Sequence, residues 1–142
     1  MDEFYPMPSF PTLAVRDLEA SLRWYCEGLG FTLVFTMPGP AGAALAHLRW
    51  AKYADLMLRS GLRAEGQPGL GVTLTFAVGD DLDALAARAR RHGAIFVREP
   101  EDRPWNARDF TVADPDGYNL TFTKGPLDID LTIDEVAARV RG

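Results

Sequence analysis

The stretch Thr12–Ala20, TLAVRDLEA, leads into a helical segment that ends at Gly30 and then into an apolar run. A matching stretch at residues 73–84, TLTFAVGDDLDA, leads into a helical segment that ends at Gly93 and then into another apolar run. The spacing is kept as well, because Gly30 and Gly93 are 63 residues apart. A supersecondary unit that occurs twice predicts two similar modules that face each other across a shared cleft.

Each half carries the signals of a strand, a helix and three further strands. Asp17 and the pair Asp80-Asp81 stand where the helix N-caps are expected, and Thr132 with Glu135 forms a capping box for a helix in the tail. A turn is expected at Asp114-Pro115-Asp116-Gly117, and a long loop after residue 97. The expected strands cover residues 9–15, 31–37, 43–50 and 55–59 in the first half, and 71–78, 94–97, 108–112 and 118–123 in the second.

These elements predict one α+β domain over residues 1–142, built from two βαβββ modules at 9–59 and 70–124. The Gly- and Pro-containing stretch 60–69 links the modules, and residues 126–142 form a C-terminal helical tail. Strands of this kind curl into a cupped, partly open mixed sheet. Open sheet edges are best closed by a second copy, so we expect a homodimer with modules paired between chains.

Composition excludes several classes of function. A hydrophobic fraction of 47% and a charged fraction of 25% are typical of a soluble globular protein, and no apolar run is long enough to span a membrane. The net charge of −5 argues against nucleic acid as a partner. The start Met1-Asp2-Glu3-Phe4 lacks the order of a signal peptide. A single cysteine, Cys26, permits no internal disulfide, so we expect a reducing, cytoplasmic location.

The strands alternate large apolar residues with small or weakly polar ones. Thr73, Thr75 and Ala77 alternate with larger residues on the fifth strand, and Asn119 and Thr121 do so on the last. Because successive side chains point to opposite faces, one face of each strand lies against the helices and the other carries Thr, Ala and Asn. A solvated face would carry Lys and Glu more often, which favours the wall of a pocket.

Two motifs resemble the vicinal oxygen chelate superfamily, which includes glyoxalase I, extradiol dioxygenases, fosfomycin-resistance enzymes and bleomycin-resistance proteins. The first is the run from Leu13 to Tyr25, LAVRDLEASLRWY, followed by Gly28-Leu29-Gly30-Phe31, and the second is Asp114-Pro115-Asp116-Gly117 before the last strand. The resemblance covers roughly residues 10–124 and includes the repeat. It implies the glyoxalase/bleomycin-resistance/dioxygenase-like fold.

Enzymes of that superfamily hold a divalent metal through His and Glu side chains on four strands. The resemblance carries these ligand positions to Phe10, Met57, Thr73 and Thr121, and none of the four is His, Glu or Asp. Neutral Thr hydroxyls, Met and Phe are poor ligands for such cations. We therefore expect no metal, no other cofactor and no catalytic residue.

A further stretch resembles the bleomycin-resistance branch of the superfamily. The run 104–110, PWNARDF, is similar to its Pro-Trp-Gly-x-Arg-Glu-Phe signature, with Asn106 in place of Gly and Asp109 in place of Glu. The loss of Gly is expected to change the loop that presents Trp105. Arg108 and Asp109 are expected to form structural charge pairs. The resemblance implies a metal-free dimer that sequesters a flat, cationic antibiotic between aromatic side chains and acidic surface.

Phe35, Trp50 and Trp105 are the predicted ligand-stacking residues, although packing in the core or in a dimer interface is at least as strong an alternative for the first two. The predicted binding set consists of Phe35, His47, Trp50, Met57, Trp105 and Asp109. The leading hypothesis is a metal-independent protein that sequesters an aromatic or cationic antibiotic-like molecule in a dimer cleft. One alternative is a metal-dependent lyase or dioxygenase-like enzyme with an altered site, and another is a protein whose pocket is vestigial and whose partner is a protein.

Overall fold

The computed structural model of the protein describes residues 3, 5–40, 42–63, 68–69 and 71–142. Parts of the predicted link at 60–69 and of the start at 1–4 lie outside these residues. The first module contains β1 (Thr12–Ala14), α1 (Leu18–Arg23), the π-helical turn η1 (Trp24–Gly28), β2 (Thr32–Gly39), β3 (Gly42–Ala51) and β4 (Ala54–Arg59). The second contains β5 (Thr73–Ala77), α2 (Leu82–Arg91), β6 (Ile95–Arg103), β7 (Ala107–Ala113) and β8 (Asn119–Lys124), and α3 (Ile133–Arg141) follows.

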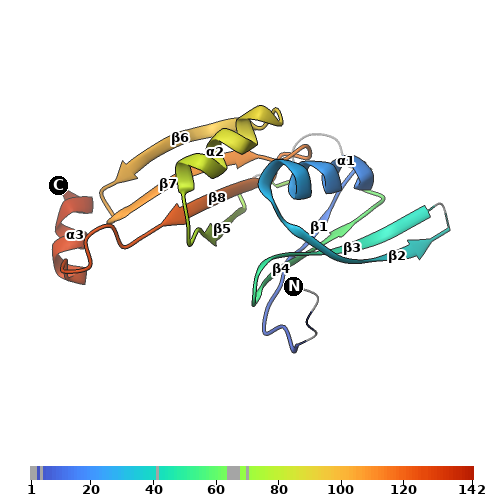
Figure 1. Ribbon diagram of the computed structural model, residues 1–142, viewed down its shortest axis with the longest axis horizontal. Coiled ribbons are helices and arrows are strands. Elements are labelled where there is room, and N and C mark those ends of the chain that lie inside the picture. The colour runs from blue at the N-terminus through green and yellow to red at the C-terminus, as the bar shows by residue number, and fades with distance from the viewer. Residues whose placement is uncertain (1–2, 4, 41, 64–67, 70) are drawn as a thin grey trace.

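The two modules have the same sheet topology. The strand order is β1-β4-β3-β2 in the first sheet and β5-β8-β7-β6 in the second. In each sheet the first and last strands of the module pair in parallel, and the other neighbours are antiparallel. Helix α2 packs against the π-helical turn η1, which follows α1, where the modules meet (Figure 1). The α+β fold class predicted from the sequence is confirmed.

The helix caps follow the sequence signals. The side chain of Asp17 accepts a hydrogen bond from the amide of Ala20, and that of Asp81 accepts one from Ala84. At the third helix Thr132 and Glu135 form the expected capping box. None of the helices in the described part of the chain is long and apolar enough to cross a membrane.

The prediction of a short strand at 94–97 followed by a long loop is wrong. Strand β6 continues to Arg103, and Glu101 and Asp102 still pair with β7. The charged residues hid this strand because they lie on a sheet edge, where charge is tolerated and discourages pairing with other chains. Pro100 falls within a register shift between β6 and β7, a position where a residue without N–H can be accommodated.

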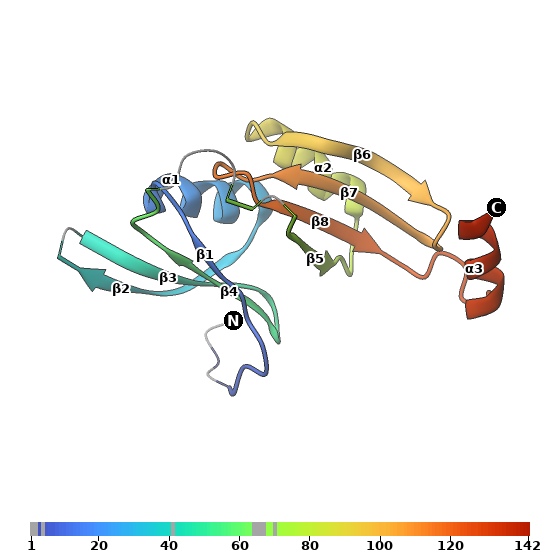
Figure 2. The same ribbon diagram turned by 180° about the vertical axis from the view of Figure 1, so that it is seen from behind.

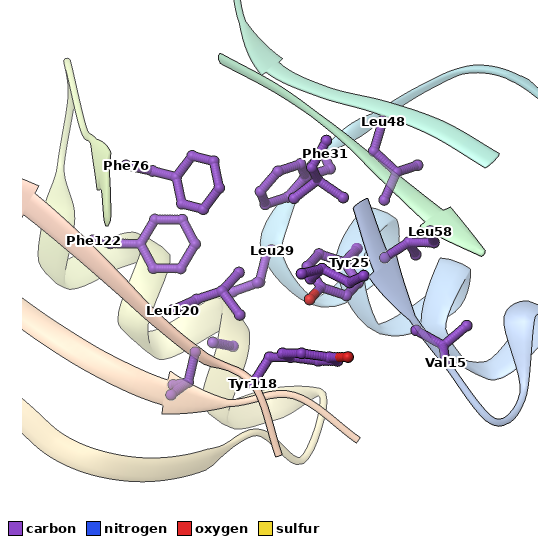
Figure 3. Close-up of a cluster of buried hydrophobic side chains, with 14 of the residues drawn as sticks. Val15, Tyr25, Leu29, Phe31, Leu48, Leu58, Phe76, Tyr118, Leu120 and Phe122 are labelled. Carbon is purple, nitrogen blue, oxygen red and sulfur yellow. The ribbon is translucent and has the colours of Figure 1, made fainter. Parts of the chain in front are cut away.

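The core lies between the two modules as well as within them. Figure 3 shows Phe31 from the first module facing Phe76 and Phe122 from the second. The rings of Phe31 and Phe76 meet edge to face with centroids 5.3 Å apart. Phe76 and Phe122 are stacked at 5.6 Å. The modules are therefore joined by aromatic packing, which sets the orientation of one sheet relative to the other.

The C-terminal helix α3 lies at the far end of the second module, away from the first (Figure 2). The N-terminal residues lie beside the first sheet instead. None of the residues of α3 is buried. The tail is therefore an addition to the end of the second sheet and not part of the core.

Candidate functional site

A cavity of about 580 Å³ lies between the end of the second sheet and α3. The sheet contributes the ends of β5 and β8 and the start of β7, and the turn before β7 contributes Trp105. Thr123 and Ala77 come from the weakly polar faces of their strands. The cavity is lined by Ala77, Val78, Trp105, Asn106, Ala107, Thr123, Gly125, Pro126, Leu131, Thr132, Ile133, Val136 and Ala137.

Trp105 is an exposed aromatic residue at the edge of this cavity. It lies in the turn between β6 and β7, and 42% of its surface is exposed. The guanidinium of Arg98 lies 5.5 Å from the centre of its ring. An indole in this position offers a flat apolar face to a ligand.

Asn106 ties the chain after β8 to the turn that carries Trp105. Its φ of 64° is left-handed, a conformation that Asn adopts more readily than most residues and that Gly adopts freely. Its side-chain amide donates to the carbonyl of Asp128 at 2.9 Å, and its side-chain carbonyl accepts from the amide of Asp128 at 2.9 Å. Its backbone carbonyl accepts from the amide of Leu127. The Asn that replaces the usual Gly therefore keeps the turn and adds a link to the tail.

Asp109 lies on β7 and forms a buried ion pair with Arg103. Arg103 donates to its carboxylate at 2.8 Å, and both side chains are nearly inaccessible to solvent. Arg108 points elsewhere and pairs with Asp83 and Asp102. Both residues thus form charge pairs, as expected, and neither borders the Trp105 cavity.

Three of the predicted residues lie in one row across the first sheet. His47 on β3 is paired with Phe35 on β2 and with Met57 on β4. The rings of Phe35 and His47 meet edge to face with centroids 5.2 Å apart. The structure therefore brings Phe35, His47 and Met57 together, but in the first module, whereas Trp105 lies in the turn between β6 and β7 of the second, beside α3.

His47 belongs to a buried polar network that sequence reasoning missed. Its Nε2 lies 2.6 Å from Oδ2 of Asp55, and Arg49 donates to the same carboxylate through Nε and Nη2. The phenol of Tyr5 donates to Asp55 at 2.6 Å. Burial would raise the pKa of Asp55, but the hydrogen bonds from Arg49, Tyr5 and His47 outweigh it and lower this pKa. The sequence signal that could have indicated this network is the presence of His47 and Arg49 at alternating positions of one strand.

Trp50 occupies a third place, between the modules. Its indole N–H donates to the carbonyl of Ala77 at 2.7 Å. Its ring lies 5.2 Å from that of Phe31 and 5.1 Å from that of Phe122. Trp50 therefore packs between the modules, which agrees with the packing alternative. It lines a different cavity from Trp105.

The profile of the Glyoxalase/Bleomycin resistance protein/Dioxygenase superfamily matches residues 9–122 of this chain. The chain belongs to this superfamily. It is 30% identical over 128 residues to the bleomycin resistance protein of Geobacillus stearothermophilus, covering 82% of this chain and 95% of the relative. It has the same identity and coverage with the bleomycin resistance protein of Staphylococcus aureus.

Several solved structures are similar to this fold. TioX from Micromonospora sp. ML1 superposes with a TM-score of 0.67 at 25% identity, covering 87% of this chain and 98% of TioX. TnmS3, an antibiotic binding protein from Streptomyces sp. CB03234, gives a TM-score of 0.66 at 25% identity with the same coverage. The fosfomycin resistance protein FosX from Mesorhizobium loti gives 0.64 at 20% identity, over 89% of this chain and 93% of FosX, and shows the shared fold.

The four positions that the resemblance assigns to metal ligands carry side chains of other kinds. Phe10 and Met57 lie in the first module, and Thr73 and Thr121 in the second. The hydroxyl of Thr121 is hydrogen bonded to that of Thr111 at 2.7 Å. Among the described residues, no group of three or more His, Cys, Asp and Glu side chains is arranged to hold a metal ion.

Proposed function

We propose that this protein binds and sequesters a small aromatic or cationic antibiotic-like molecule, without a metal. The observation that carries the proposal is the cavity of about 580 Å³ with the exposed indole of Trp105 at its edge. Its volume falls within the usual range for sites that bind small molecules. The bleomycin resistance proteins at 30% identity and the antibiotic binding protein among the similar structures support this function.

The chemistry of the donor positions supports a function without metal. A divalent cation requires about three protein ligands, and the positions that the resemblance assigns to metal ligands offer a phenyl ring, a thioether and two neutral hydroxyls. His47 and Asp55 together would supply only two ligands, and Asp55 is already bound by Arg49. Elemental analysis of the purified protein tests this part, and a stoichiometric content of Ni, Zn, Fe or Mn would support the enzyme alternative instead.

A homodimer is part of the proposal. Ile95 and Val97 on the edge strand β6 are exposed, and so are Leu33 and Met37 on the edge strand β2. Apolar side chains on open edges favour association with a second copy. Light scattering coupled to size-exclusion chromatography should give twice the mass of 15.6 kDa, and a monomer at micromolar concentration would contradict the dimer without affecting the binding proposal.

A panel of aromatic and cationic antibiotics that includes bleomycin tests the binding function. A bound member should raise the melting temperature and quench tryptophan fluorescence, and Trp105→Ala should abolish the quenching. Trp24→Phe is a matched control, because Trp24 lies in η1 and does not border the cavity. Absence of any response across the panel would overturn the proposal.

A further inference from the structure

The lining of the Trp105 cavity contains no charged side chain. Its polar side chains, apart from the indole N–H, are those of Asn106, Thr123 and Thr132. Burying a charge without a compensating partner is costly, so the lining determines what kind of group can enter. A ligand can form hydrogen bonds only with those polar side chains that are not already bonded within the protein.

Two of the three are already used within the protein. Both polar atoms of the Asn106 side chain are bonded to the backbone of Asp128. The Thr132 hydroxyl accepts from the amide of Glu135 and donates to its carboxylate in the capping box. Among the described residues that line the cavity, only the hydroxyl of Thr123 and the indole N–H of Trp105 form no side-chain hydrogen bond within the protein. These groups can orient a neutral ligand but cannot neutralise a cation.

Asp109, the acidic residue of the predicted binding set, is also engaged elsewhere. Asp109 forms a buried pair with Arg103 and lies outside the cavity lining. Removing the cation from such a pair would leave a buried carboxylate unpaired, which is strongly unfavourable. A ligand ammonium therefore has no acidic partner inside this cavity, and water is its better environment.

The wall opposite the sheet is aliphatic. Helix α3 contributes Ile133, Val136 and Ala137, and the Asn106 link to Asp128 positions the chain just before this helix. A nine-residue helix is marginal by itself. Its apolar side chains are stabilised when a bound apolar group covers them, so ligand binding and helix packing support each other.

We propose that the group bound in the Trp105 cavity is an uncharged, planar aromatic group held between the Trp105 indole and the aliphatic side of α3. Any cationic part of the ligand stays in solvent. This inference rests on the proposed function, because it specifies the ligand chemistry of the same cavity.

A matched pair of probes tests it. 9-Anthracenemethanol and 9-anthracenylmethylammonium share one ring system and differ in a neutral hydroxyl against a cation. Titration calorimetry and energy transfer from tryptophan to anthracene should show that the alcohol binds at least about tenfold more tightly at pH 7. Equal affinity, or tighter binding of the ammonium, would overturn the inference.

A variant of the helix locates the effect in the cavity. Val136→Asp places a carboxylate in the wall and should weaken the alcohol and strengthen the ammonium until the preference is lost or reversed. Val140→Asp is the matched control, because Val140 lies one turn later on α3 and does not line the cavity. It should keep the preference of the unmodified protein. Since α3 has no buried residue, both variants should fold, which circular dichroism checks.

The outcomes separate this inference from the binding function. Binding of a panel antibiotic together with no neutral preference, or with no binding of either anthracene, overturns the inference alone. The same change of preference in both Asp variants also overturns it, because the effect would then not come from the cavity wall. No binding of any antibiotic or anthracene overturns both proposals.

Discussion

The phenol of Tyr25 donates a 2.7 Å hydrogen bond to the carboxylate of Asp114 across the junction of the two modules. Both side chains are buried. The other oxygen of Asp114 accepts from the amides of Asp116 and Tyr118, which shapes the turn between β7 and β8. Burial, the charge of Asp114 and the bond to it raise the pKa of Tyr25 well above its usual value. The phenol therefore stays protonated and remains a donor to this turn.

Replacing Tyr25 with Phe should lower the free energy of unfolding by about 2 kcal/mol, because a buried carboxylate loses its side-chain donor. Tyr118→Phe is the matched control. The phenol of Tyr118 donates to the backbone carbonyl of Ala14 at 3.0 Å, so its loss should cost about 1 kcal/mol. Urea unfolding of both variants at pH 7 measures the difference, and equal losses would show that the Asp114 bond has no special weight.

Tyr5→Phe should destabilise the protein in a pH-dependent way, because Tyr5 donates to Asp55. The pKa of Asp55 is lowered from its usual 3.8, so the stabilisation is present above pH 3.8 and is lost as the pH falls through the lower, folded value. The variant should thus differ from the unmodified protein most at pH 5–7 and least near pH 2.

Urea midpoints measured from pH 2 to 7 check the Tyr5 prediction. Tyr53→Phe is the control, because the ring of Tyr53 packs against that of Tyr5 with centroids 4.9 Å apart, and the backbone amide of Tyr53, not its phenol, donates to the Tyr5 hydroxyl. Its effect should not vary with pH. A Tyr5→Phe effect that is constant over this range would show that Asp55 is not the group involved.

Local signals in the sequence were sufficient for much of the fold. The caps at Asp17, Asp81 and Thr132 depend on residues three positions away, so the sequence predicts them directly. The full length of β6 could not be predicted in this way. Its second half is held by pairing of Glu101 with Asp109 across the sheet, and its own residues carry no apolar alternation.

The site was less predictable, because it depends on contacts between distant residues. Tyr5 and Asp55 are 50 positions apart, and Asn106 and Asp128 are 22 apart. The family resemblance identified Asn106 as a departure, but only the structure reveals its partner. Whether an aromatic side chain such as Trp50 faces a ligand or a core is likewise decided by the other module and not by neighbouring residues.

Asn106→Gly should release the tail without disturbing the turn, because Gly adopts a φ of 64° freely. Loss of both bonds to Asp128 should lower the backbone order parameters of residues 127–130 from about 0.85, typical of rigid backbone, to below about 0.6. Nitrogen-15 relaxation measures this. Asp130→Ala is the control, because it keeps both bonds between Asn106 and Asp128 and the bond from the Asp130 amide to the Asp128 carboxylate, and it should change these values little. Unchanged order in Asn106→Gly would mean that other contacts hold the tail.

Substitutions at Trp50 and Trp105 should have opposite effects, the first mainly on stability and the second mainly on ligand binding. Trp50→Phe removes the indole donor to Ala77 and reduces the packing between the modules, so it should lower the free energy of unfolding by about 2 kcal/mol. Trp105→Phe, at a residue that is 42% exposed, should cost less than about 0.5 kcal/mol.

The affinity for a bound antibiotic should change in the opposite order. Trp105→Phe reduces the stacking surface at the cavity and should weaken binding by roughly threefold to tenfold, since aromatic contacts contribute about 0.5–1.5 kcal/mol beyond the area they bury. Trp50→Phe should leave the affinity within about twofold, because Trp50 does not line the cavity. Urea unfolding and calorimetric titration of the same two variants give both quantities. If Trp50→Phe weakened binding more than Trp105→Phe in a protein that remained folded, the ligand would lie at the junction of the modules and not beside α3.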